Sequence, residues 1–373
     1  MIEGDRDALI DALETLAQFG VPAKGAARLI DIGTADYVQF VRRELLDEFV
    51  SAGASTCRVY EGPYGTGKTH LLQLLEDEAR EAGFAVARAD LSQALGFETP
   101  RALVRYLLEN ITFELDREII RSLPTILARL GTDVETGLHG ASMPHQGFAT
   151  GMTQALRGAG NGEGAALLRR FLLGERVSSL ALRRYGILGV KNPLSDRNAE
   201  KVLRTLTAGM RQFGVRGTLL LFDETEPTLS RGVRTTTRIT ASANLMRRLI
   251  DQSASGGLVA TLTVFAVLPG FIESASSLYP ALGQRLAMQT GSVVPWRMPT
   301  LPVEQASTAG SREAFVDAAV RRFVELGERL GAPPDGLAAR LELEGRRTLE
   351  ANAGGGYRRE LMKGLATVLL QVG

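Results

Sequence analysis

The spacing of apolar residues along the chain first indicates two helices. Apolar positions recur at helical spacing from Asp7 to Phe19 and again from about Ala35 to Val50. The next run, Ser55 to Tyr60, is short, apolar and partly β-branched, and a glycine follows closely, which is typical of a buried strand. A helical pattern then covers His70 to Ala82, and Phe84 to Asp90 has the pattern of a second strand. We therefore predict a strand, loop, helix, strand unit behind two N-terminal helices.

Three later apolar runs complete the predicted sheet. They are Thr218–Phe222, Leu258–Leu268 and Ser292–Trp296, and the second is rich in Val and Thr. Strands that alternate with helical stretches favour a parallel sheet with helices on both faces, because parallel neighbours need crossover connections. The predicted fold class is therefore α/β.

The same pattern divides the chain into three predicted units. The stretch between the second strand and residue 218 is mostly helical, so we interpret residues of about 100–213 as an insertion. A glycine-rich section from Gly131 to Gly164 interrupts it, and we expect a mobile loop there. Helical spacing returns from Val303 onward. The predicted units are an N-terminal helical extension (1–50), a core that contains the insertion (51–302) and a C-terminal helical lid (303–373).

Composition and charge indicate an ordinary globular protein. Of the 373 residues, 45% are hydrophobic and 23% charged, and 43 Lys plus Arg nearly balance 42 Asp plus Glu, so no global field draws the chain to nucleic acid or membrane. The single cysteine, Cys57, excludes an intrachain disulfide, and the three histidines lack zinc-site spacing. There is no leader-like start and no apolar run long enough to span a membrane. We expect a cytoplasmic protein.

A phosphate-binding motif lies between the first predicted strand and the helix after it. Its spacing is Gly62-x-x-x-x-Gly67-Lys68-Thr69, in the strand-to-helix context that this pattern requires. Glycines let backbone amides turn toward phosphate oxygens, and the helix N-terminus adds partial positive charge. We expect Lys68 to reach the β- and γ-phosphates of ATP and Thr69 to bind Mg²⁺; the alternative is a chance glycine-rich turn. The predicted nucleotide-binding residues here are Gly62, Pro63, Tyr64, Gly65, Thr66, Gly67, Lys68, Thr69 and His70.

A pair of carboxylates follows the apolar strand at residues 218–222. A Mg²⁺–nucleotide site needs a carboxylate at the end of a neighbouring strand, and Asp223 is the candidate metal ligand. Glu224 would face the γ-phosphate, where it could orient or deprotonate the attacking water, and Glu226 is a weaker candidate for that role. Acidic pairs also end ordinary strands, so the functional interpretation depends on the phosphate loop upstream.

These motifs, together with the helical C-terminal tail, resemble those of AAA+ ATPases, especially the initiator-like branch related to origin-recognition proteins. The segments Arg58–Leu72 and Tyr279–Leu286 are similar, more closely, to the ATP-binding proteins of bacterial BREX phage-defence systems. The resemblance implies a P-loop NTPase fold of AAA+ type, ATP and Mg²⁺ as cofactors, and an ATPase that assembles into a homo-oligomer.

The resemblance also suggests roles for two arginines. Arg285 looks like an arginine finger, which would reach the γ-phosphate held by a neighbouring subunit; the alternative is a surface arginine on an amphipathic helix. Arg358, behind Gly354–Gly356, looks like a second sensor that touches the nucleotide from the lid, although glycine before an arginine-bearing helix is common. The run Val267–Pro269 departs from the family pattern because it lacks a polar first sensor, which argues against fast turnover.

A local excess of arginine follows the carboxylate pair. No acidic residue occurs between Pro227 and Ile250, and interleaved Thr and Ser can also donate hydrogen bonds to phosphate. Contact with double-stranded DNA is one hypothesis; a solvated face or a subunit interface are the alternatives. The five arginines are Arg231, Arg234, Arg238, Arg247 and Arg248.

The leading functional hypothesis is an ATP-driven switch that oligomerises and acts on DNA or on another protein of the defence system. Lys68, Glu224 and Arg285 would carry the hydrolysis. The main alternative is a regulatory scaffold that binds ATP, assembles, and hydrolyses it slowly or never. A small-molecule kinase is disfavoured by the paired carboxylates and the predicted lid.

Overall fold

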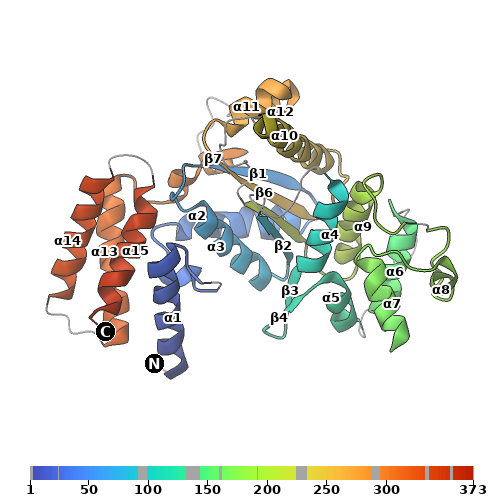
Figure 1. Cartoon of the computed structure of the whole chain (residues 1–373), viewed down its shortest axis with the longest axis horizontal. Coiled ribbons are helices and arrows are strands. Elements are labelled where there is room, and N and C mark those ends of the chain that lie inside the picture. Colours follow the sequence, from blue (N-terminus) through green and yellow to red (C-terminus); the bar gives the residue numbers. More distant parts are fainter. Residues whose placement is uncertain are drawn as a thin grey trace.

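The chain forms a central sheet with helices around it and a helical wing on either side (Figure 1). C-terminal helices form one wing, and helices of the predicted insertion form the other. The computed structural model describes residues 3–23, 25–90, 99–131, 143–158, 162–190, 192–223, 233–286, 295–331, 336–352 and 356–372.

Five neighbouring strands of the sheet are parallel, in the order β2-β5-β6-β1-β7. An antiparallel hairpin, β3 and β4, extends the sheet beyond β2. The α/β class and the parallel central sheet predicted from the sequence are confirmed, and the sheet suits a P-loop NTPase; the antiparallel hairpin at its edge was not predicted. The strands are β1 (Thr56–Glu61), β2 (Ala85–Asp90), β3 (Thr112–Leu115), β4 (Glu118–Arg121), β5 (Thr218–Asp223), β6 (Thr261–Val267) and β7 (Thr300–Pro302).

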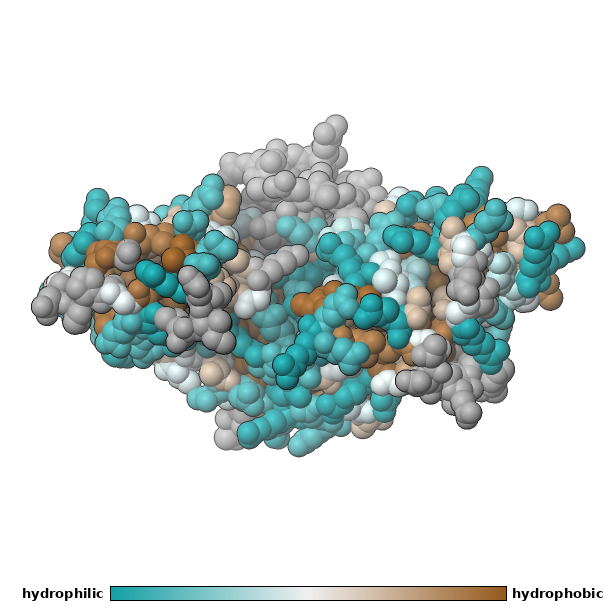
Figure 2. Space-filling view, turned by 90° about the horizontal axis from the view of Figure 1, so that it is seen from below, coloured by the Kyte–Doolittle hydropathy of each residue, from teal (hydrophilic) through white to brown (hydrophobic). Residues whose placement is uncertain are grey.

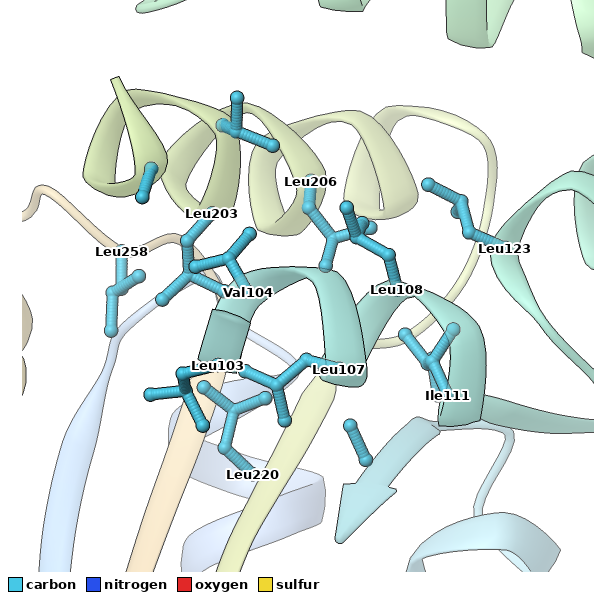
Figure 3. Close-up of a cluster of buried hydrophobic side chains, with 14 of the residues drawn as sticks. Leu103, Val104, Leu107, Leu108, Ile111, Leu123, Leu203, Leu206, Leu220 and Leu258 are labelled. Atoms are coloured by element: carbon cyan, nitrogen blue, oxygen red, sulfur yellow. The ribbon is translucent and has the colours of Figure 1, made fainter. Parts of the chain in front are cut away.

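Alternate residues of the central strands pack into two separate cores, because successive side chains point to opposite faces of a sheet. Leu219 and Leu221 pack with α2, η2 and α3 on one face. Leu220 and Phe222 pack with α4, α9 and α10 on the other, where Figure 3 shows leucines of α4 between Leu220 and α9. The helices are α2 (Ala35–Phe40), η2 (Val41–Val50, a π-helix), α3 (Lys68–Glu81), α4 (Pro100–Asn110), α9 (Ala199–Gln212) and α10 (Val233–Ala254).

The hairpin β3–β4 is the part of the insertion that the sequence did not indicate. Its turn residues, Asp116 and Arg117, have φ of +53° and +66°. Two-residue hairpin turns with positive φ at both positions usually carry Asn-Gly or Asp-Gly. Because this turn carries Asp-Arg, the usual local signal for a hairpin is missing.

The rest of the insertion is helical, including part of the section expected to be a loop. Helix α6 occupies Gln146–Leu156, and Phe148 and Met152 on it are fully buried. The expected mobile loop from Gly131 to Gly164 is therefore wrong over α6, while residues 132–142 and 159–161 lie outside the described residues. The other helices here are α5 (Leu123–Leu130), α7 (Glu163–Leu172) and α8 (Ser179–Arg183).

The strand predicted at Ser292–Trp296 is wrong where the structure describes it. Pro295–Arg297 forms a 3₁₀ turn, η3, and the next strand, β7, begins only at Thr300. The Trp296 ring packs edge-on to Tyr37, at 5.5 Å between centroids, so its apolar character reflects burial beside α2. Residues 292–294 lie outside the described part of the chain.

A third core joins the two ends of the chain. Leu9, Leu13 and Leu16 of α1 pack with Leu361 and Leu365 of α15, and α1 and α15 lie side by side in Figure 1. The remaining helices are α1 (Glu3–Phe19), η1 (Ala27–Ile30), α11 (Phe271–Leu278), α12 (Pro280–Leu286), η4 (Val303–Ala306), α13 (Arg312–Leu330), α14 (Leu337–Ala351) and α15 (Tyr357–Leu370).

The surface seen in Figure 2 is mostly hydrophilic, with small hydrophobic patches, one of them over the C-terminal helices. Leu343 on α14 is among the exposed leucines, at 69%. Within the described ranges, none of the helices combines the length and apolar character needed to cross a bilayer.

Candidate functional site

The phosphate loop connects the end of β1 to the first turn of α3. Gly65 and Gly67 have φ of +75° and +99°, which glycine adopts without steric cost. Helix α3 begins directly after Gly67, so its first backbone N–H groups lie at the loop. The Lys68 ammonium donates to the carbonyl oxygens of Gly62 (2.5 Å) and Pro63 (3.0 Å). The lysine is therefore held at the loop itself.

A pocket of about 1010 Å³, open to solvent at its mouth, lies beside this loop. One wall is the loop and the start of α3, and Asp223 reaches it from the end of β5. Much of the remaining lining comes from segments near the two ends of the chain: α1 and η1 from the N-terminal part, and η4, α13 and α15 from the C-terminal part. Among the predicted site residues, those that line it are Tyr64, Gly65, Thr66, Gly67, Lys68, Thr69, His70, Asp223 and Arg358.

Thr69 and Asp223 bring two oxygen ligands to the same pocket. Hydroxyl and carboxylate oxygens suit Mg²⁺, which, bound with a nucleotide, needs only one or two protein ligands besides phosphates and water. In the described ranges, no three His, Cys, Asp or Glu side chains gather as a metal cluster. The donor set thus fits a Mg²⁺–nucleotide complex. Glu224 and Glu226 lie outside the described residues.

Asp223 is held by an arginine that the sequence analysis did not single out. Its carboxylate, 6% exposed, accepts from Arg88 on β2, with 2.6 Å between Nη2 and Oδ2. The same guanidinium lies 3.7 Å from Glu76 of α3. The signal in the sequence is Arg88 itself, which interrupts the apolar run Ala85–Ala89, because a largely buried arginine requires an anionic partner.

Arg358, at the start of α15, reaches the phosphate loop across 292 positions of sequence. Its Nη1 donates to the Thr66 carbonyl oxygen at 3.3 Å, and its guanidinium lies 4.2 Å from the ring centre of Phe315. The backbone is also close here, since a Cβ on Gly65 would lie 2.8 Å from the carbonyl oxygen of Gly356. Arg359 instead donates to the Phe19 carbonyl oxygen, so Arg358 is the arginine at the loop.

His70 and Asp31 form the side of the pocket next to η1. His70 Nε2 lies 3.4 Å from Asp31 Oδ1, and Thr34 donates to the same carboxylate. Burial alone raises the pKa of Asp31, but the hydrogen bonds from His70 and Thr34 outweigh burial and leave that pKa below its ordinary value. Asp31 was not predicted as a site residue, since one acidic residue before Ile-Gly carries no recognisable signal.

Arg285 lies apart from the pocket, on α12, with its side chain 43% exposed. It forms an ion pair with Asp251 of α10 in the same chain. Asp251 also pairs with Arg247, at 3.1 Å, and Arg247 lies over the ring of Tyr279. These contacts connect α10, α11 and α12.

The five arginines considered for DNA contact are only partly described. Arg247 is held by Asp251 and Asn244, whereas Arg248 is exposed. Arg234 and Arg238 belong to α10, and Arg231 lies outside the described residues. Of the two arginines whose side chains the structure describes, Arg247 is engaged within the protein and Arg248 is exposed.

Comparison with known proteins settles the family. A family model described as "BREX system ATP-binding protein BrxC/D" matches residues 3–158 and 132–307. The chain belongs to this BrxC/D family. Membership of the BrxC/D family confirms the resemblance to BREX proteins, and it supports ATP binding and a role in BREX defence. No curated protein and no solved structure matches the chain.

Proposed function

We propose that this BrxC/D-family protein is an AAA+ ATPase that works as a nucleotide-driven switch. The observation that supports it best is the convergence of Lys68, Thr69, Asp223 and Arg358 on one pocket, although they come from α3, β5 and α15. Such convergence of a cation, two metal-type oxygens and a second cation suits the phosphate end of ATP.

Each residue has a proposed task in hydrolysis. Lys68 and the loop amides bind the β- and γ-phosphates, and Thr69 and Asp223 hold Mg²⁺, which would neutralise phosphate charge. Glu224, next to Asp223 in sequence, would orient the attacking water or take its proton. Arg358 would contact the nucleotide from the C-terminal helices, and Arg285 would act on the nucleotide of a neighbouring subunit.

Turnover measured across protein concentration, with and without double-stranded DNA, tests this proposal. Wild type should hydrolyse ATP faster per protomer as concentration rises, and Glu224→Gln should lower turnover by about 10²- to 10⁴-fold while ATP still binds. Glu273→Gln, at an exposed carboxylate on α11, is the control that should keep wild-type turnover. Tight ATP binding without turnover under every condition would refute the hydrolytic part.

A second candidate function is a nucleotide-gated scaffold with slow or no hydrolysis. It is favoured by the end of β6, the strand beside β1, where Val267 is fully buried and Leu268 and Pro269 follow without a polar side chain. The Val267 carbonyl oxygen accepts from the Gly62 N–H, so this strand end borders the phosphate loop. A water-orienting side chain is thus missing from β6 itself.

The proposal also covers the protein's partners, its assembly and its division into domains. We propose a cytoplasmic homo-oligomer that acts on double-stranded DNA or on other BREX proteins, with Arg248 as the exposed arginine available for phosphate contact. The division into residues 1–50, 51–302 and 303–373 is likewise proposed. Loss of the DNA effect on turnover in Arg248→Gln would support the DNA contact.

A further inference from the structure

The face that β2 turns toward α3 carries a largely buried arginine, Arg88. Residues two apart on a strand share a face, and Val86 belongs to the core formed with α3, so Arg88 points to that side as well. Asp223 occupies the corresponding face of β5, two residues after Leu221. Arg88 and Asp223 therefore meet between the sheet and α3, directly behind the phosphate loop.

The guanidinium of Arg88 bridges two carboxylates in this protected space. Its Nη2 lies 2.6 Å from Asp223 Oδ2 and its Nη1 lies 3.7 Å from Glu76 Oε2. The side chains of Arg88, Asp223 and Glu76 are 19%, 6% and 15% exposed, so solvent screens these charges weakly. Glu76 is in turn held by Arg80, at 3.1 Å, on the same helix. Asp223 is thus supported from β2 and, through Arg88, from α3.

We propose that Arg88 is a positioning residue for the metal-side carboxylate. By holding Oδ2 it fixes the plane of the Asp223 carboxylate, and Glu76 fixes Arg88. Side chains that hydrogen-bond a metal ligand typically change metal affinity or activity by 10- to 100-fold when they are removed. This inference rests on the proposed Mg²⁺–ATP site and adds the residue that orients its carboxylate.

The test is the Mg²⁺ dependence of nucleotide binding, measured on the full chain with a fluorescent ATP analogue. Arg88→Gln should raise the Mg²⁺ concentration for half-maximal binding by about 10- to 100-fold. Binding without Mg²⁺ should stay within about twofold, because Arg88 does not line the pocket. Arg42→Gln is the matched control: Arg42, at 24% exposed, also pairs with a glutamate of α3, Glu78, but its ion pairs include neither Glu76 nor Asp223. It should keep the wild-type Mg²⁺ dependence.

A second variant keeps the inference testable if Arg88→Gln does not fold. Arg88→Lys keeps the charge but has one nitrogen, which cannot serve Asp223 and Glu76 with separate N–H groups, so the half-maximal Mg²⁺ concentration should still rise severalfold. An unchanged Mg²⁺ dependence in a folded variant would overturn the positioning role. Tighter Mg²⁺ binding in the variant would also overturn it, because it would mean that the positive charge of Arg88 merely competes with Mg²⁺ for Asp223. If wild-type binding itself ignored Mg²⁺, the Mg²⁺ site of the proposed function would be refuted together with this inference.

Discussion

The Asp31 carboxylate connects two parts of the pocket wall. It accepts hydrogen bonds from the Thr34 backbone N–H and hydroxyl, ahead of α2, and lies 3.4 Å from His70 on α3. These partners favour the ionised form more than burial disfavours it, so the pKa of Asp31 is lowered. One side chain therefore joins the segment after η1 to the first turn of α3.

Asp31→Asn should lower the free energy of unfolding by about 1–2 kcal/mol at pH 7, because hydrogen bonds to a charged group are weakened. A carboxyl with a lowered pKa contributes stability above its unfolded pKa and loses it as pH falls through the folded pKa. The difference between wild type and variant in urea unfolding should therefore shrink in acid. Asp11→Asn, at an exposed carboxylate of α1, should stay within about 0.5 kcal/mol at every pH. A difference that grew in acid would contradict this assignment.

At the scale of elements, an ion pair connects α10 to α12. Asp251 of α10 holds Arg285 of α12 and also Arg247 of its own helix. The side chains of Arg285 and Asp251 are 43% and 30% exposed, so their pair is worth roughly 0.2–1 kcal/mol. An interaction of that size holds Arg285 loosely, which is compatible with its proposed action on the nucleotide of a neighbouring subunit.

Asp251→Asn should release Arg285 and so raise ATP turnover at protein concentrations where the wild type is only partly assembled. The increase should be at most about fivefold, because the ion pair that is lost contributes little energy. Arg285→Ala should abolish most turnover at every concentration. The comparison is steady-state hydrolysis against protein concentration, with Glu273→Gln as the neutral control. Equal turnover in wild type, Asp251→Asn and Arg285→Ala would show that Arg285 is a surface arginine and not a finger.

The sequence predicted those helices and strands whose residue spacing is distinctive. The other elements and contacts depend on residues that are distant in sequence. The strand, glycine loop and helix around Lys68 follow from residue spacing, and so does the apolar strand before Asp223. The hairpin β3–β4 was missed because its turn lacks the usual glycine. The bond from Arg88 to Asp223 joins two strands that pair only in the folded sheet, so no spacing rule could reveal the partner.

For the molecule as a whole, the pocket is a boundary between the sheet and the helices at the two chain ends. The backbones of the loop and of the segment before α15 approach closely: a Cβ on Gly65 would lie 2.8 Å from the Gly356 carbonyl oxygen, and one on Gly356 would lie 3.0 Å from the Tyr64 carbonyl oxygen. Arg358 then donates to the loop and lies over the Phe315 ring of α13, while Arg312 of α13 lies over the ring of Tyr357. The C-terminal helices are thus in direct contact with the loop, so a movement of the loop would change these contacts.

Gly65→Ala should destabilise the protein more than Gly256→Ala. Both positions have similar positive φ, +75° and +71°, and so a similar backbone strain of about 1–2 kcal/mol. Only at Gly65 would the new methyl meet another backbone, at 2.8 Å, which adds about 1–3 kcal/mol of overpacking. Urea unfolding of both variants measures the difference, and ATP affinity should fall for Gly65→Ala alone. Equal losses of stability would mean that the loop and α15 separate at little cost.

The shared core of α1 and α15 has a consequence for the order of events during synthesis. Helix α1 is made well before α15, so Leu9, Leu13 and Leu16 find their packing partners only some 340 residues later. At about 5–20 residues per second, the apolar face of α1 waits roughly 20–70 s for its partner. Leu16 and Arg358 both line the pocket beside the phosphate loop, so that pocket is complete only after α15 has packed on α1. A nascent chain would therefore acquire the proposed ATP site only after α15 has been made.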